Sequence, residues 1–317
     1  MTLIARTSIA LAATALAALI FAVAPATASP ASQSAGLAQV RAELKEASAA
    51  LGQIWGEDYE DDDFSDDEDD DFSEDLDDDL GDVLGDDFDD DDVSDDSESV
   101  DLNAVAANLQ HTATARQLAS KLKPRKLRPV ALLAVAEQAD ENVFEYADDI
   151  GWVEAQEQPT FVDALAKSLD VRSAMIGGLI SAAPKQAESA RGKSLKTVAD
   201  LLSDGDAEVL LDTLAEEDGY GATPAVKQTV VPVLAGMLDG AGKTAAKIRD
   251  LGSALRGNER RDPRNAAGAI QSELDGLPDY VDELFTDMED YDDPAAGVAA
   301  FCGYLAGLPL PTPSACG

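Results

Sequence analysis

The sequence predicts an all-α protein in which antiparallel helix pairs follow a disordered Asp-rich segment. Three observations support this prediction. From Asp101 onward, Ala, Leu and Val recur with the 3.6-residue period of a helix and almost never with the two-residue period of a strand. Prolines and Asp-Gly pairs punctuate the same region where helices are expected to begin and end. Residues 57–101 hold 28 Asp or Glu and no Lys or Arg, a composition that does not build an apolar core.

The first 28 residues are typical of a secretory signal peptide. Arg6 supplies a positive start, residues 9–24 form an apolar run, and Ala26-Thr27-Ala28 matches a small-x-small cleavage site. The mature chain should therefore begin near Ser29 and be secreted or held in the cell envelope. The apolar run is short for a bilayer span, so we expect no membrane association after cleavage.

Residues 29–56 are expected to contain one amphipathic helix, over residues 36–55. Apolar residues recur there at three- and four-residue intervals, with charged residues between them. These apolar residues are Leu37, Val40, Leu44, Leu51 and Ile54.

The acidic tract, residues 57–101, predicts a flexible polyanion. Aspartate oxygens are hard ligands that suit Ca²⁺, but the tract lacks the glycine at the sixth position of an EF-hand loop. We therefore expect diffuse Ca²⁺ binding at millimolar concentrations and no other cofactor. The candidate metal-binding residues are Asp69, Asp70, Asp71, Asp77, Asp78, Asp79, Asp89, Asp90, Asp91 and Asp92. The tract could instead be a self-repelling, solubilising linker.

Apolar residues interrupt the acidic tract at every fourth position and would form one stripe on a helix. These candidate partner-binding residues are Phe72, Leu76, Leu80, Leu84 and Phe88. Carboxylate repulsion and the two glycines Gly81 and Gly85 oppose this helix in isolation. A basic partner could induce it, either from outside or from the chain's own Lys121–Arg128 cluster.

The helical body is expected to span residues 102–307. Helices are predicted to start at X-Pro steps, namely Gln158-Pro159, Ala183-Pro184, Thr223-Pro224, Asp262-Pro263 and Asp293-Pro294. Turns are predicted at Asp170, Asp204, Asp239 and Asp275, at intervals of 34 to 36 residues, with Gly205, Gly240 or Gly276 closing a helix. A period near 35 residues is that of stacked helix pairs. Both an irregular α-bundle and a short HEAT-like α-solenoid agree with this pattern.

The two cysteines, Cys302 and Cys316, lie close together at the end of the chain. In an exported protein they are expected to form a disulfide. This bond would fasten the tail, residues 308–317, to the body. One His and two Cys make a zinc site with protein ligands an unfavourable interpretation.

Three short motifs were considered as sites of chemistry. "GMLDGAGKT" at 236–244 partly resembles a Walker A loop, but the upstream glycine is one residue too early, so a helix end at Asp239-Gly240 is preferred. "SKLK" at 120–123 has the Ser-x-x-Lys spacing of penicillin-recognising enzymes without their other motifs, which favours an exposed helix end. His111 has no catalytic neighbours in sequence. The chain is therefore not expected to be an enzyme.

Charge limits the partners that the chain can bind. The formal net charge of −40 opposes binding to nucleic acid and to anionic membranes. It favours divalent cations and basic proteins, so the sequence predicts an exported, non-catalytic helical interaction protein. Two alternatives stay open: an acidic pro-segment (29–126) removed near the basic run "KLKPRKLRP", and an extracellular enzyme of unknown class. The sequence leaves the oligomeric state open.

Overall fold

The computed structural model describes residues 30–55, 100–123, 127–203, 205–217 and 221–317, and these residues contain helices and no strand. The predicted fold class, antiparallel helix pairs, is confirmed. In chain order the helices are α1 (Pro30–Leu51), α2 (Leu102–Lys121), α3 (Arg128–Asp148), α4 (Gln158–Ala182), α5 (Glu188–Asp200), α6 (Asp206–Ala215), α7 (Pro224–Ala254), α8 (Arg261–Asp287) and α9 (Pro294–Leu305). None of these described helices is both long enough and apolar enough to cross a membrane.

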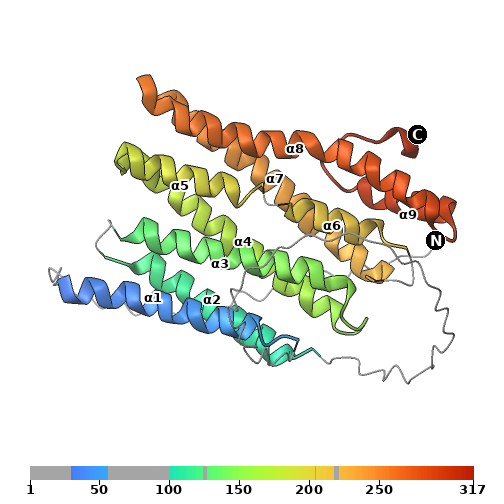
Figure 1. Cartoon of the computed structure of the whole chain (residues 1–317), viewed down its shortest axis with the longest axis horizontal. Helices are drawn as coiled ribbons and strands as arrows, with labels where there is room; N and C mark the ends of the chain where they lie inside the picture. Colours follow the sequence, from blue (N-terminus) through green and yellow to red (C-terminus); the bar gives the residue numbers. More distant parts are fainter. Residues whose placement is uncertain (1–29, 56–99, 124–126, 204, 218–220) are drawn as a thin grey trace, which may run out of the picture.

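The helices form stacked layers (Figure 1). α1 pairs with α2, α3 with α4, and α7 with α8, while contacts between α2 and α3, α4 and α7, and α5 and α8 join the layers. The shorter α5 and α6 follow one another along the stack, and α9 packs against α6 and α7. α1, which the sequence separated from the body, is one layer of the body.

Proline marks most of the helix starts, as predicted. Pro159, Pro224 and Pro294 lie in the first positions of α4, α7 and α9, and Pro263 lies in the first turn of α8. There the missing N–H costs no hydrogen bond, because the first N–H groups of a helix have no partner within it. The Ala183-Pro184 step differs from the prediction, because it lies in a 3₁₀ turn (Ala183–Lys185) before α5.

Asp204 itself lies outside the described residues, but α5 ends at Asp200 and α6 begins at Asp206, so the predicted break between helices is confirmed there. The other three predicted turns are wrong. Asp170, Asp239 and Asp275 lie inside α4, α7 and α8, far from the helix ends. Between α5 and α6, Gly205 has a φ of 79°, the left-handed conformation expected there.

The three wrong turns have a common physical reason. Apolar residues are buried on both sides of each site, as with Leu238 and Ala241 in α7, so continuing the helix buries more surface than a turn would. The aspartates bond along the helix surface instead: Lys243 donates to Asp239, and Gln271 donates to Asp275 over 2.9 Å. A repeat of about 35 residues with a turn at each aspartate is therefore absent from the described helices.

Two apolar clusters form the core. The first contains the end of α1, the start of α2, the end of α3, α6, the first part of α7 and α9, with Tyr146 and Phe161 at its centre. Their rings meet edge to face at 5.7 Å. The second contains the end of α2, the start of α3, α5 and the last part of α7, and includes Leu132, Ile176 and Ile248. Every long helix contributes to both clusters, which divide the molecule into two halves.

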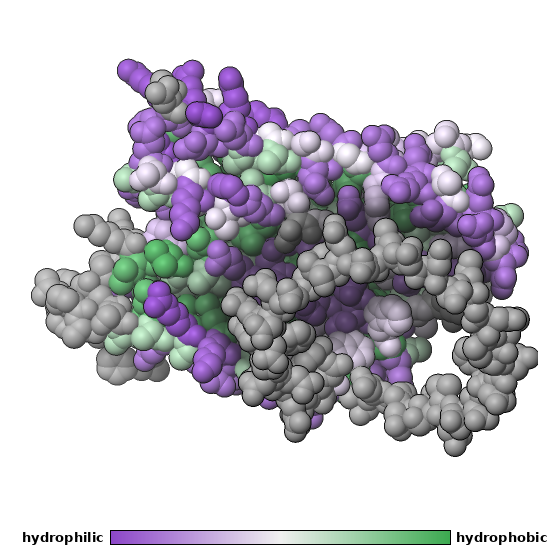
Figure 2. Space-filling model, in the orientation of Figure 1, coloured by the Kyte–Doolittle hydropathy of each residue, from purple (hydrophilic) through white to green (hydrophobic). Residues whose placement is uncertain are grey.

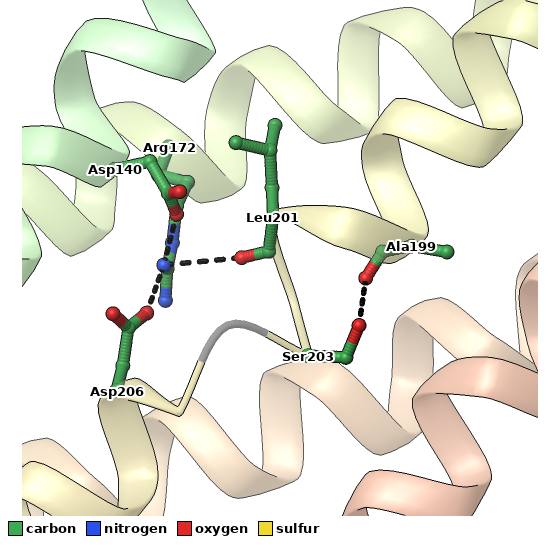
Figure 3. A network of polar contacts seen from close by, with 6 residues as sticks. All are labelled: Asp140, Arg172, Ala199, Leu201, Ser203 and Asp206. Carbon is green, nitrogen blue, oxygen red and sulfur yellow. Dashed lines mark hydrogen bonds and ion pairs between the residues drawn. The ribbon is translucent and has the colours of Figure 1, made fainter. Parts of the chain in front are cut away.

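A buried arginine lies where the two halves meet (Figure 3). Arg172 of α4 is 2% exposed and donates to the carboxylates of Asp140 in α3 and Asp206 at the start of α6. It also donates to the carbonyl oxygen of Leu201, after α5, over 3.2 Å. One guanidinium thereby ties α3 and α4 to the turn between α5 and α6.

A second buried polar network attaches α1 to α2 and α3. The Asn108 side chain of α2 donates to the carbonyl oxygen of Ala47 in α1 over 2.9 Å and to Asn142 of α3 over 3.0 Å. The Tyr146 hydroxyl donates to Asn108 over 2.8 Å, and Asn142 donates to the Thr112 hydroxyl. Asn108 and Asn142 have no exposed surface, so each of these bonds replaces one lost to water.

Candidate functional site

The candidate site is the base of the acidic tract, where the described residues end at Trp55 and resume at Val100. The backbone N–H of Asp101 donates to the carbonyl oxygen of Ile54 over 2.8 Å. Ile54 is 1% exposed and Val100 8% exposed, and both belong to the first core cluster. We call these four residues, 54, 55, 100 and 101, the clamp. The clamp makes the tract an insertion between the paired helices α1 and α2, with both ends held at one place.

A side-chain contact holds each end of the clamp. The indole N–H of Trp55 donates to the Asp149 carboxylate, after α3, over 3.1 Å. The Asp101 carboxylate accepts from the backbone N–H of Asn103 over 2.8 Å and so caps α2. The pKa of Asp149 is raised to about 7, chiefly by burial and in smaller part by the charges of Glu145 and Asp148, against the opposing effect of the Trp55 hydrogen bond.

The half of the molecule that holds the clamp is strongly acidic. Its described residues contain twenty-four Asp or Glu and two Lys. We call it the acidic half, made of residues 47–55, 100–112, 141–170, 205–217, 221–239 and 274–317. One stretch of α8 and the following turn, residues 279–293, supplies eight of the carboxylates. The Asp-rich tract is therefore attached to a surface of its own sign.

The two lysines of the acidic half are already occupied. Lys167 forms an ion pair with Asp163 one helical turn away. Lys227 is 1% exposed and donates to the carbonyl oxygen of Glu216. A basic partner that approaches this half consequently meets carboxylates without a competing exposed cation from the described chain, apart from the paired Lys167.

The predicted metal-binding aspartates, 69–71, 77–79 and 89–92, lie outside the described residues. The same holds for the predicted partner-binding stripe, whose residues are Phe72, Leu76, Leu80, Leu84 and Phe88. The basic cluster proposed as an internal partner is described only in part. Lys121 and Lys123 are exposed at the end of α2 and Arg128 begins α3, in the half away from the clamp.

The structure also places the other sequence motifs. Residues 236–244 are helical throughout, so the glycines of "GMLDGAGKT" form neither a phosphate loop nor the predicted helix end. Ser120 and Lys123 lie at the exposed end of α2, as predicted. His111 differs from a simple surface residue, because its Nδ1 lies 2.8 Å from the Glu43 carboxylate of α1.

The cysteines are joined as predicted. Cys302 in α9 and Cys316 in the last 3₁₀ turn form a disulfide, with their Cα atoms 5.5 Å apart. The bond holds the tail beside α9, whose Phe301 and Leu305 are buried in the first core cluster.

A cavity of about 480 Å³ between α4 and α7 is lined by residues of both halves, whereas the cavity lined by the acidic half alone is small. This smaller cavity, of about 170 Å³, combines Glu216, Glu217, Lys227, Asp293 and Tyr304. This volume is below the 300–1,000 Å³ of typical ligand pockets. Within the described part of the chain, no three His, Cys, Asp or Glu side chains gather as they would around a metal ion.

Sequence reasoning missed the clamp and Arg172, although both leave a signal. Apolar residues border the acidic run directly, with Ile54 and Trp55 before it and Val100 after it, which indicates two anchored ends. Arg172 interrupts an apolar helical stripe of α4 that runs Phe161, Leu165, Ser168, Arg172, Ile176 and Leu179. A lone arginine on such a stripe predicts a buried ion pair. Nothing in the sequence identifies its partners Asp140 and Asp206.

Fold and site together define a class: a stacked helical bundle that carries an acidic insertion closed at its base. Comparison of the chain with models of known protein families, with curated proteins and with solved structures finds no match. Its function therefore has to be inferred from the geometry of its own residues.

Proposed function

We propose that this chain is an exported, non-catalytic interaction protein that presents its Asp-rich segment as a closed loop. The loop gathers divalent cations and basic partners with low affinity. The clamp is the observation that carries this proposal. By fixing both ends of the segment at the acidic half, it adds the charges of the tract to those of the bundle surface and directs cations to one end of the molecule.

The low affinity follows from the chemistry of the segment. Asp oxygens suit Ca²⁺, but without a preformed loop each ion has to order its own ligands. Binding should therefore occur at millimolar free Ca²⁺, with many ions per chain, and should weaken with added salt. A basic protein releases the same counterions and should compete with Ca²⁺.

Packing argues against the alternative of a removable pro-segment. Removal of residues 29–126 would take away α1 and α2, whose Val40, Ala47, Val105 and Ala115 are almost fully buried. It would also leave the buried Asn142 of α3 without its partner Asn108. Cleavage inside the tract alone would leave these contacts intact. The enzyme alternative has no comparable support.

The test compares three full-length proteins by Ca²⁺ titration calorimetry and equilibrium dialysis at millimolar free Ca²⁺. The Ser-segment variant replaces every Asp and Glu of residues 57–98 with Ser and keeps the clamp. A second variant neutralises only the bundle surface, with Asp279→Asn, Asp282→Asn, Glu283→Gln and Asp287→Asn, all at exposed positions.

We expect the Ser-segment variant to lose most of the bound Ca²⁺ and the surface variant to keep most of it. Equal Ca²⁺ binding by the wild-type protein and the Ser-segment variant would refute the proposal. Loss only in the surface variant would move the cation site from the segment to α8.

A further inference from the structure

The other half of the molecule carries a cleft of opposite charge. Between the last part of α7 and the first part of α8 lies a cavity of about 600 Å³. Arg249 of α7, Arg260 of the connecting turn and Arg264 of α8 line it, and Asp275 is the one acidic lining residue. Figure 2 shows hydrophilic residues over this end of the bundle. Three guanidinium groups around one cleft favour carboxylates, which arginine binds through paired hydrogen bonds.

The arginine cleft is open to a ligand. All three arginines are exposed, although Arg260 donates to the carbonyl oxygen of Leu255 and so is partly engaged in the turn. Within the described part of the chain, Arg249 and Arg264 form no ion pair. Small residues, among them Gly252 and Gly268, form the wall of the cleft, and a Cβ added at Gly268 would meet nothing within 4 Å.

Charge in the surrounding half agrees with an acidic ligand. We call it the basic half, residues 35–46, 113–123, 127–140, 171–203 and 240–273. Its described residues hold eighteen Lys or Arg against ten Asp or Glu, in a chain whose formal net charge is −40. That total charge opposes nucleic acid as the ligand. An acidic peptide would be attracted to the basic half, and its carboxylates could bind the arginines of the cleft.

We propose that the arginine cleft docks the Asp-rich segment of a second copy of this chain, so that molecules associate end to end. Each molecule then offers a carboxylate-rich loop at one end and the cleft at the other. Such a contact joins two different surfaces and is heterologous, so it extends beyond a dimer unless a ring closes.

Geometry favours a second copy over the chain's own segment. The clamp shares the first core cluster with the first part of α7, around Val230, whereas the cleft begins at Arg249, about 29 Å from Val230 along that helix. The α3–α4 layer also separates α1 and α2 from α7 and α8 (Figure 1). Half of the segment, about 22 residues, has a relaxed span of roughly 26 Å. Because both ends are fixed, the segment would have to stretch around the bundle and back to reach its own cleft.

This inference goes beyond the proposed function, since it assigns a second surface and makes the segment a ligand of the chain itself. It rests on the proposed function only in that both use the same segment. Ca²⁺ binding and self-association are separate measurements. A negative result in one measurement does not affect the interpretation of the other.

The first experiment measures mass by sedimentation velocity across a concentration series in about 0.15 M salt, where charges further apart than roughly 8 Å are screened. Arg249→Glu/Arg264→Glu reverses the cleft, and Gly268→Gln fills it without changing charge. Arg256→Glu/Arg261→Glu is the matched control, because it reverses two exposed arginines that do not line the cleft. We expect concentration-dependent association of the wild-type protein and the control, reduced at least tenfold in both cleft variants.

The second experiment mixes two proteins that should each be monomeric alone. Arg249→Glu/Arg264→Glu keeps the segment and lacks the cleft, while the Ser-segment variant keeps the cleft and lacks the acidic segment. Docking between copies predicts a one-to-one complex in the mixture. A wild-type protein that stays monomeric, cleft variants that associate like the wild type, or a mixture that forms no complex would each overturn the proposal.

Discussion

The two halves of the bundle share their helices and differ in their surfaces. α1, α2, α3, α4, α7 and α8 each contribute to both core clusters, and the same residue types, Ala, Leu and Val, are buried in both. Yet the described acidic half contains twenty-four carboxylates and only two lysines, whereas the basic half contains eighteen of the twenty described Lys and Arg. Charge changes sign along individual helices while the packing continues unchanged.

The difference teaches that exposed charge and buried packing are set independently in this chain. Along α7, Lys227 and Asp239 are followed by three exposed cations and one acid, Asp250, while apolar residues face the core along the whole helix. The apolar stripe of the helix packs into the core, and the charges on the exposed face determine which partners the helix can bind. The two ends can therefore recognise opposite ligands without any change of fold.

The largest expected loss of stability comes from a substitution that breaks the connection between the two halves. Arg172→Leu removes the cation that pairs with Asp140 and Asp206, so two buried carboxylates each lose this ion pair. We expect the free energy of unfolding to fall by about 3–5 kcal/mol, measured by urea denaturation at pH 7.

A compensating variant controls for lost packing. Arg172→Leu combined with Asp140→Asn and Asp206→Asn removes the uncompensated charge and should recover at least half of the loss. If Arg172→Leu changes stability by less than 1 kcal/mol, the triad does not hold the halves together.

A smaller expected effect comes from a substitution that tests how α1 is attached to α2 and α3 in the acidic half. Asn108→Ala removes the acceptor of the buried Tyr146 hydroxyl and the side-chain donor to the Ala47 carbonyl and to Asn142. Asn142 keeps its bonds to Gln138 and Thr112. We expect a loss of about 2–3 kcal/mol and faster hydrogen exchange of α1 amides. Thr114→Ala is the control, because its hydroxyl bonds only to the Gln110 carbonyl at an exposed site. Exchange that speeds up equally in α8 would show a general rather than a local effect.

The smallest expected change in stability comes from Asp149, a buried carboxyl in the acidic half. The pKa of Asp149 is raised to about 7 in the folded protein, from an ordinary value near 4. The folded state therefore binds this proton more tightly than the unfolded state. The stability that the proton contributes is complete below about pH 4 and is lost as the pH rises towards 7.

Asp149→Asn should remove this dependence, because the amide oxygen can still accept from Trp55 without a charge. The variant should gain about 1–2 kcal/mol over the wild type at pH 7.5 and almost nothing at pH 4.5. This is less than the about 4 kcal/mol that corresponds to a shift of three pH units, because relaxation of the protein and entry of water lower the cost of a buried charge. Urea denaturation at the two pH values measures it. A difference that stays constant with pH would contradict the expected titration.

Local signals predicted the fold well. The helical period, the prolines at Pro159, Pro224 and Pro294, and the left-handed Gly205 all act within one helical turn, so they can be read from the sequence. The Asp-Gly pairs at 239–240 and 275–276 led to two wrong turn predictions, because a glycine in mid-helix costs only about 1 kcal/mol. Burial of the flanking apolar residues outweighs that cost.

The site was less predictable because it depends on contacts between distant segments. Composition identified the acidic tract, but the hydrogen bond from Asp101 to Ile54 and that from Trp55 to Asp149 appear only when α1, α2 and α3 pack. The arginine cleft is similar. Arg260 and Arg264 lie close together in the sequence, whereas Arg249, in the last part of α7, joins them only through the pairing of α7 with α8.

The clamp has a consequence for how this protein can change over time. Once both ends of a flexible loop are fixed, the entropy of closing it grows only with the logarithm of its length, so doubling the number of residues costs about 0.6 kcal/mol. The hydrogen bond from Asp101 to Ile54 fixes the chain on either side of residues 56–99. Insertions, deletions and substitutions within them should leave the bundle almost equally stable, which frees the length and charge of the loop to diverge quickly while the helices around it stay constrained.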